Sequence, residues 1–143
     1  MGRILCLDVG DKRIGIAVSD PFAQSAQALT TLQRQTFAKD CEKIFQLSLD
    51  YDVSKMIVGL PLDLNDEEGP QAKKIRFFTD GLKDFFHEKK STAVFEMWEE
   101  SFTSQEAEKI LLQADVSREK RKKVIDKVAA GLILQNYLDN HDA

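Results

Sequence analysis

The sequence has few cysteines and no long apolar run, and both scarcities exclude classes of protein. Its two cysteines, Cys6 and Cys41, lie far apart in segments that look like a strand and a helix. We therefore interpret them as small core hydrophobes rather than as a disulfide or a zinc site. No stretch approaches the length of a membrane span. The N-terminus lacks a signal-peptide pattern, because only four apolar residues separate Arg3 from Asp8, so we expect a cytoplasmic protein with no membrane partner.

Histidine is equally scarce, with two residues in the chain. His87 and His141 fall on polar helical stretches, and we interpret both as solvated surface residues. No serine–histidine or cysteine–histidine dyad is therefore a convincing candidate for nucleophilic catalysis.

Length and composition fit one ordinary globular domain spanning residues 1–143, with 43% hydrophobic and 31% charged residues. The net charge of −4 argues against nucleic-acid binding over the whole surface. The charges are unevenly distributed, however, with acids at 63–68 and 96–108. The basic residues gather near the C-terminus, at Arg118, Lys120, Arg121, Lys122, Lys123 and Lys127. This stretch permits a local polyanion site, although it also fits a solvated helix start.

Hydrophobic periodicity predicts an α/β fold. Residues 3–9 and 14–19 look like strands joined by a tight turn, and a third extended segment at 28–32 completes an antiparallel meander. A helix at 37–51, a strand at 55–58, a helix from Pro70 and a strand at 92–98 imply parallel neighbours. The apolar face of the helix from Pro70 is predicted to be Ala72, Ile75, Phe78, Leu82 and Phe85. A capping box at 103–106 and a final helix at 118–140 follow, so we expect a mixed sheet flanked by helices.

Three acids stand where such a sheet would place a ligand, beyond the carboxyl ends of its strands. Asp8 lies inside the apolar run of the first strand, where an ionised carboxylate is costly unless a cation or a donor faces it. Glu99 and Glu100 follow the strand at 92–98. Asp126 begins a helical stripe that continues through the apolar positions Ala129, Ala130, Ile133 and Tyr137.

Each acid also has a plainer interpretation. Asp8 could cap the turn after its strand. Glu99 is more readily a solvated neighbour than a ligand, and Asp126 could pair with Lys122 or Arg121 on its own helix. Their joint placement favours a site, because three converging carboxylates would repel one another without a cation.

Oxygen-only ligands suit Mg²⁺ or Mn²⁺ rather than zinc, and the chemistry that such a site favours is phosphodiester hydrolysis. The segment 59–62 should form one wall of the cleft through a close backbone approach at Gly59. The acidic loop at 66–70 could contact substrate or be a plain surface connection. We expect phosphates to be bound by Lys12, Arg13, Arg118, Arg121, Lys122 and Lys123.

These residues resemble the YqgF, or RuvX, family of Holliday junction resolvase-like and pre-16S ribosomal RNA nucleases. The resemblance rests on residues 7–17 (LDVGDKRIGIA), 57–62 (IVGLPL) and 68–72 (EGPQA), on Glu100 before residues 103–107 (TSQEA), and on Asp126 before Ala129-Ala130. It implies a ribonuclease H-like fold and a metal-dependent nuclease with Asp8, Glu100 and Asp126 as catalytic acids and metal ligands. The implied role is maturation of the 5′ end of 16S ribosomal RNA in the cytoplasm.

Four positions depart from the usual family pattern. Asp11 stands where threonine is common, Glu99 where aspartate is common, Ser101 where arginine is common, and Lys127 where serine is common. Asp11 adds negative charge near the cleft, and Ser101 removes a cation that could hold a phosphate.

Other functions remain open at this point. A resolvase of branched DNA would use the same acids, while structured RNA is favoured only through the resemblance. Asp8-Val9-Gly10 with Gly15 is also similar to the first phosphate hairpin of actin-like and sugar-kinase folds, but a second lobe is not visible. A non-catalytic RNA-binding domain, or a homodimer, is compatible with the residues.

Overall fold

The computed structural model describes residues 2–62, 67–100 and 118–140, except for the side chains of Glu100 and of 118–124. Its elements are β1 (Arg3–Val9), β2 (Arg13–Ser19), β3 (Ala26–Gln33), α1 (Phe37–Asp50), β4 (Val53–Pro61), α2 (Pro70–Glu88), β5 (Val94–Glu100) and α4 (Arg118–Asn140). The predicted element at 103–106 lies outside the described residues. In the part of the chain that is described, no helix is both long and apolar enough to cross a membrane.

A five-stranded mixed sheet forms the centre, in the order β3-β2-β1-β4-β5. The β1–β2 and β2–β3 pairs are antiparallel, whereas β1–β4 and β4–β5 are parallel. This confirms the predicted mixed sheet. The carboxyl ends of β1, β4 and β5 consequently meet at one edge, together with the turn between β1 and β2.

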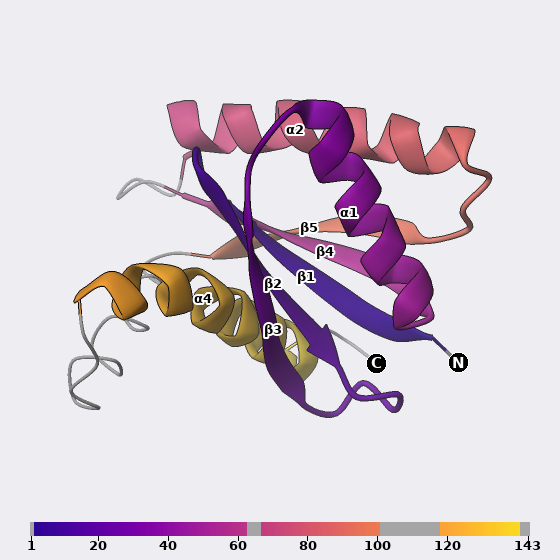
Figure 1. The fold of residues 1–143 in the computed structure, drawn as a ribbon. Helices are drawn as coiled ribbons and strands as arrows, with labels where there is room; N and C mark the ends of the chain where they lie inside the picture. The colour runs from indigo at the N-terminus through magenta and orange to yellow at the C-terminus, as the bar shows by residue number, and fades with distance from the viewer. Residues whose placement is uncertain (1, 63–66, 101–117, 141–143) are drawn as a thin grey trace.

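Helices cover both faces of the sheet (Figure 1), with α1 and α2 on one side and α4 on the other. Alternation along β1 sorts its side chains between them. Leu5 and Leu7 belong to the larger core beneath α1 and α2, while Ile4 and Cys6 pack against α4. Asp8 continues the second set and therefore lies on the α4 face of the sheet.

The sequence predicted the helices well because their apolar periodicity is strong. Helix α1 begins after Thr36, whose side chain accepts a hydrogen bond from the Lys39 amide. In α2 the predicted face is correct except at its end, where Phe86 is buried and Phe85 only partly so. Cys6 and Cys41 are both buried, as expected of core hydrophobes.

The last strand differs from its predicted position. It was expected at 92–98 and is found at Val94–Glu100. Parallel pairing with β4 continues to the Pro61–Glu100 pair, which extends the strand past the apolar residues that marked it in the sequence. Glu99 and Glu100 are therefore successive strand residues rather than residues that follow the strand.

Candidate active site

The site is built around Gly15 of β2, which is the register partner of Asp8 on β1. A Cβ at position 15 would overlap the main-chain carbonyl of Asp126, and it would lie 2.9 Å from the Lys127 amide nitrogen. Helix α4 thus rests directly on the backbone of β2 at this point. The absent side chain of Gly15 is what lets Asp126 come close to Asp8.

The remainder of α4 keeps this contact in place. Ala129, Ala130, Ile133 and Tyr137 are buried against the sheet, as the helical stripe predicted. At Gly59 a Cβ would lie 2.7 Å from Ile133 Cδ1, so the expected close approach at this glycine is made by α4. Gly15 was missed in this role, although a glycine inside a strand is itself a signal for close approach.

Asp8 and Asp126 influence each other electrostatically. Burial first, and the negative charge of Asp126 second, raise the pKa of Asp8 from 3.8 to about 7. Within the described part of the chain no cation or hydrogen-bond donor is recorded against the Asp8 carboxylate. The alternative interpretation of Asp8 as a turn cap is therefore not supported by any hydrogen bond among these residues.

Asp126 is held by a cation from β2. Arg13 Nε donates to Asp126 Oδ2 at 2.6 Å, and both side chains are partly buried. The sequence suggested Lys122 or Arg121 as the partner of Asp126, but their side chains lie outside the described part of the molecule. Among the described side chains the partner is Arg13, 113 positions away. Arg13 was predicted to bind phosphate; the structure places it where it orients a carboxylate at the site.

Glu99 and Glu100 are the last two residues of β5. The backbone of Glu100 pairs with Pro61 at the carboxyl end of β5, on the edge of the sheet that Asp8 occupies. Its side chain lies outside the described part of the molecule. Glu99 is exposed and lies with Leu60, Arg76 and Met97 along a cleft of about 510 Å³ beside β5. Glu99 is thus a solvated neighbour, as preferred from the sequence.

The described acids fit a divalent cation in chemistry but do not complete a ligand set. Two carboxylates, one destabilised by burial and by like charge, offer hard oxygen ligands of the kind that Mg²⁺ and Mn²⁺ favour. Among the side chains that the structure describes, no group of three histidine, cysteine, aspartate or glutamate residues could hold a metal. A third protein ligand would therefore come from a side chain beyond those described, such as Glu100.

The turn between β1 and β2 is braced from behind by Arg34. Its Nη1 donates to the Gly10 carbonyl at 2.7 Å, its guanidinium carbon lies 4.9 Å from the centre of the Phe78 ring, and its Nε lies 3.7 Å from Asp40 Oδ2. Asp40 is fully buried and accepts a hydrogen bond from the Gln35 amide. The sequence analysis missed this cluster because its members come from a strand end and two helices.

The remaining predicted site residues lie at the rim of the candidate active site or outside the described part of the molecule. Lys12 is exposed in the turn, and Asp11 beside it forms an exposed ion pair with Lys74 at 3.5 Å. Lys127 is partly buried on α4. Arg118, Lys120, Arg121, Lys122 and Lys123 belong to the first turns of α4, where only the backbone is described. Ser101 and His141 lie outside the described residues.

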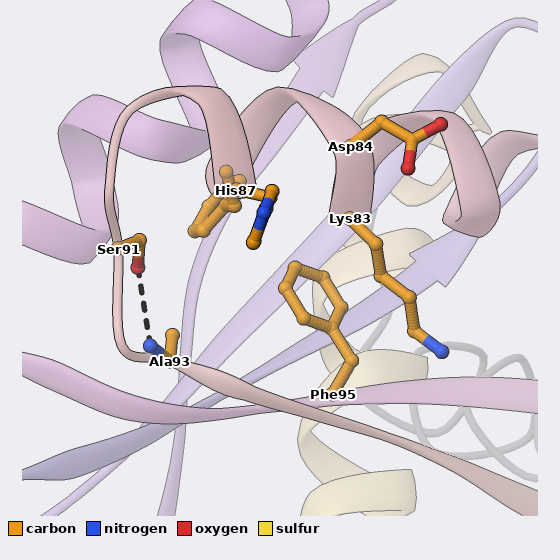
Figure 2. Close-up of a pocket in the computed structure, with 7 residues that line it drawn as sticks. Lys83, Asp84, His87, Ser91, Ala93 and Phe95 are labelled. Atoms are coloured by element: carbon orange, nitrogen blue, oxygen red, sulfur yellow. Dashed lines mark hydrogen bonds between the residues drawn. The ribbon is translucent and has the colours of Figure 1, made fainter.

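A second cavity, of about 370 Å³, lies at the far end of α2. Figure 2 shows His87 of α2 and Phe95 of β5 lining the space between these elements, and a hydrogen bond from the Ala93 amide to the Ser91 hydroxyl closes its rim. Val94 begins β5 at this end, so the cavity lies opposite the edge that carries Asp8. His87 is exposed, as the sequence predicted.

Comparison with known proteins supports one family. A family model described as "RuvX: Holliday junction resolvase" matches residues 2–140. A protein of Thermoanaerobacter pseudethanolicus named "Putative pre-16S rRNA nuclease" is 49% identical over 139 residues, covering 96% of both chains. A protein of the same name from Desulforamulus reducens is 45% identical over 138 residues, covering 96% of this chain and 97% of the relative.

Solved structures agree on the fold. RuvC of T. thermophilus in complex with a Holliday junction substrate has a TM-score of 0.56 at 11% identity, covering 99% of this chain and 97% of that chain. Fowlpox virus resolvase with Holliday junction DNA has a TM-score of 0.56 at 14% identity, covering 96% and 97%. These likenesses show the ribonuclease H-like fold that was expected. With a family model that matches almost its whole length and relatives near half identity, the chain belongs to the RuvX family.

Proposed function

We propose that this protein is a divalent-metal-dependent endonuclease that hydrolyses phosphodiester bonds in structured RNA, with the 5′ end of precursor 16S ribosomal RNA as its substrate in the cytoplasm. The observation that carries the proposal is the approach of Asp126 to Asp8 over Gly15, at a position where burial first and the charge of Asp126 second raise the pKa of Asp8 to about 7. The names of the relatives support the choice of RNA.

In this proposal Asp8, Glu100 and Asp126 hold the metal through carboxylate oxygens. Mg²⁺ or Mn²⁺, when bound, lowers the pKa of a water molecule and stabilises charge on the phosphate and on the leaving oxygen. Water adds to phosphorus, and the bond from phosphorus to the sugar oxygen breaks. Arg13 engages Asp126 Oδ2 and so fixes the direction in which the other oxygen of that carboxylate points.

The basic residues would hold the rest of the substrate. Lys12 is exposed at the rim of the acid pair, and Arg118, Arg121, Lys122 and Lys123 lie at the start of the helix that carries Asp126. We expect the double substitution Lys122→Glu with Lys123→Glu to weaken RNA binding and to flatten its dependence on salt. An unchanged slope would mean that this stretch is ordinary surface.

The decisive experiment compares cleavage of a pre-16S ribosomal RNA fragment by wild type, Asp8→Asn and Glu99→Gln, each with Mn²⁺ and with chelator. Asp8→Asn removes a ligand charge on the α4 face, whereas Glu99→Gln removes an exposed charge from the same region. We expect cleavage to require Mn²⁺ and to be lost only in Asp8→Asn, by about a hundredfold or more. Equal cleavage by the three proteins would exclude the proposed site.

Branched DNA is the second candidate substrate, because the family description names Holliday junction resolvase. A four-way DNA junction in the same assay separates the two substrates. Preference for the junction under matched salt would assign the site to resolution rather than to RNA processing. Light scattering of the same samples reports whether the protein is the homodimer that the sequence left open.

A further inference from the structure

One aromatic side chain of α2 stands largely in solvent. Phe77 on α2 is 84% exposed, the most exposed large hydrophobic side chain in the described part of the molecule. A single exposed apolar residue is common on protein surfaces and carries no meaning by itself. Its surroundings and its position relative to the site decide whether it has a use.

On the amino-terminal side of Phe77 the charged side chains of α2 are cationic, whereas Asp80, an exposed acid, follows it by three residues. Lys73 and Lys74 precede it by four and three residues, so the three side chains share one side of the helix. Both lysines are exposed. The half of α2 from residue 70 to 79 carries three cations and no acid, although the dipole of a helix disfavours cations near its N-terminus. Helix stability therefore does not explain this composition.

One of the three cations is already engaged elsewhere. Arg76 makes two hydrogen bonds to Glu68, at 2.6 and 2.7 Å. Lys73 and Lys74 remain to contact a ligand, since the ion pair of Lys74 with Asp11 is long and solvent-exposed on both sides. We refer to Lys73, Lys74 and Phe77 as the α2 platform.

The α2 platform adjoins the proposed catalytic edge. Asp11, which Lys74 reaches at 3.5 Å, follows Asp8 by three residues in the turn after β1. In Figure 1 the amino end of α2 lies at the same end of the sheet as the carboxyl end of β1. Asp8 and Asp126 lie on the α4 face, so a nucleic-acid strand held there would cross the end of the sheet at the β1–β2 turn, beside Asp11, to reach the lysines and Phe77 on α2.

We propose that the α2 platform binds a single-stranded nucleic-acid segment that flanks the cleaved bond, with a base stacked on Phe77 and phosphates at Lys73 and Lys74. The inference rests on the proposed function, for which it names a second contact region. Aromatic rings interleaved with cations are the usual way to hold single strands without reading sequence. A second copy of the protein fits less well, because a lone ring among charged side chains does not form the apolar centre of a dimer interface.

Binding can be tested without cleavage, using a fluorescent single-stranded RNA of about 12 nucleotides in chelator. Phe77→Ala should weaken binding about 5- to 20-fold, and Phe77→Tyr should retain it. Phe22→Ala is the matched control, because Phe22 is 71% exposed but lies between β2 and β3, at the opposite end of the sheet. Lys73→Ala with Lys74→Ala should reduce the salt slope by about 1.4, for two single-strand phosphates.

A direct signal of stacking is available from Phe77→Trp. Its added fluorescence should be quenched by the RNA, whereas that of Phe22→Trp should not change. The proposal is overturned if Phe77→Ala and Phe22→Ala bind RNA equally to wild type, or if light scattering shows that Phe77→Ala merely dissociates a dimer. Failure of the nuclease proposal is separate, because it would appear as Asp8-independent cleavage while these binding measurements, made in chelator, would stand.

Discussion

At the scale of single residues, Asp8 is an acid whose ionised form the folded structure disfavours. The sequence predicted this acid and Asp126 because each breaks an apolar pattern at a position that faces a core. It could not predict that Arg13 pairs with Asp126, since the two are 113 residues apart and only the contact of α4 with β2 joins them. Local spacing suggested partners on the same helix, and tertiary packing provided a different one.

Asp8→Asn should stabilise the metal-free protein in a pH-dependent way. The pKa of Asp8 is raised in the folded state, from 3.8 to about 7, so folding favours the protonated acid. This contribution is complete below the unfolded pKa and is lost as pH rises through about 7. We expect the variant to be more stable than wild type by about 2 kcal/mol near pH 8. This is less than the free energy that corresponds to the whole pKa shift of Asp8, because its side chain keeps some contact with solvent.

Urea unfolding in chelator, at about pH 4 and about pH 8, measures this effect. The advantage of Asp8→Asn should fall to near zero at the lower pH. Glu99→Gln, which neutralises an exposed acid, should change stability by less than about 0.5 kcal/mol at either pH. A stability gain for Asp8→Asn that is the same at both pH values would contradict the assigned cause.

Two glycines allow a paired test of the contact beneath Asp126. Gly15→Ala places a methyl group against the main chain of Asp126 and should destabilise the fold by about 3 kcal/mol, because backbone cannot move aside as a flexible side chain can. Gly131→Ala meets only ordinary contacts, at 3.8 Å or more, and should stabilise α4 by about 0.5–1 kcal/mol. Thermal unfolding of both variants measures these changes in stability. Equal changes in the two variants would show that α4 does not rest on Gly15.

At the scale of elements, the sequence predicted the strands and helices from periodicity, and errors arose where pairing extends an element. Val94–Glu100 is shifted by two residues from the predicted strand because its partner β4 continues to Pro61. The shift matters for function, since it makes Glu99 and Glu100 successive residues of one strand, paired with Leu60 and Pro61. Glu100 was favoured over Glu99 on resemblance, and its role as a ligand stays a prediction.

At the same scale, Arg34 and Asp40 hold the β1–β2 turn against two helices, and removing their contacts should lower the free energy of unfolding. Asp40→Ala deletes a buried carboxylate. It leaves the Gln35 amide without its hydrogen-bond acceptor and the Arg34 guanidinium without its ion-pair partner. We expect a loss of about 3 kcal/mol. The control is Glu68→Ala, which removes an exposed partner of Arg76 and should lower stability far less. If urea unfolding gave similar losses for the two variants, the buried Asp40 would contribute no more to stability than an exposed acid does.

At the scale of the whole molecule, a net charge of −4 coexists with cations gathered at the end that carries the acid pair. Lys12, Lys73 and Lys74 are exposed there beside the exposed acids Asp11 and Glu68, and the basic first turns of α4 belong to the same helix as Asp126. An acidic protein can attract a polyanion locally where its cations outnumber its acids. The uneven distribution of charge along the chain was predicted from composition alone. The contribution of the α2 lysines could be recognised only from the fold.

Metal binding should be visible as stabilisation of the whole molecule. A ligand that binds only the folded state adds about 2.7 kcal/mol at a hundredfold excess over its dissociation constant. Mg²⁺ or Mn²⁺ should therefore raise the midpoint of thermal unfolding of wild type, and the rise should be smaller near pH 6 than near pH 8 because the ion competes with the proton on Asp8, whose pKa is about 7. Calorimetry in buffers of different ionisation enthalpy should detect the released proton.

Asp8→Asn separates this effect from general screening of charge. The variant has no proton to release and one ligand charge fewer, so both the stabilisation by metal and its pH dependence should be lost. Glu99→Gln loses the same charge from an exposed position and should respond to metal as wild type does. NaCl at matched ionic strength should reproduce only the part due to screening. If Asp8→Asn were stabilised by metal as strongly as wild type, the ion would bind elsewhere, and the raised pKa of Asp8 would be a cost of close packing with α4 rather than preparation for a cation.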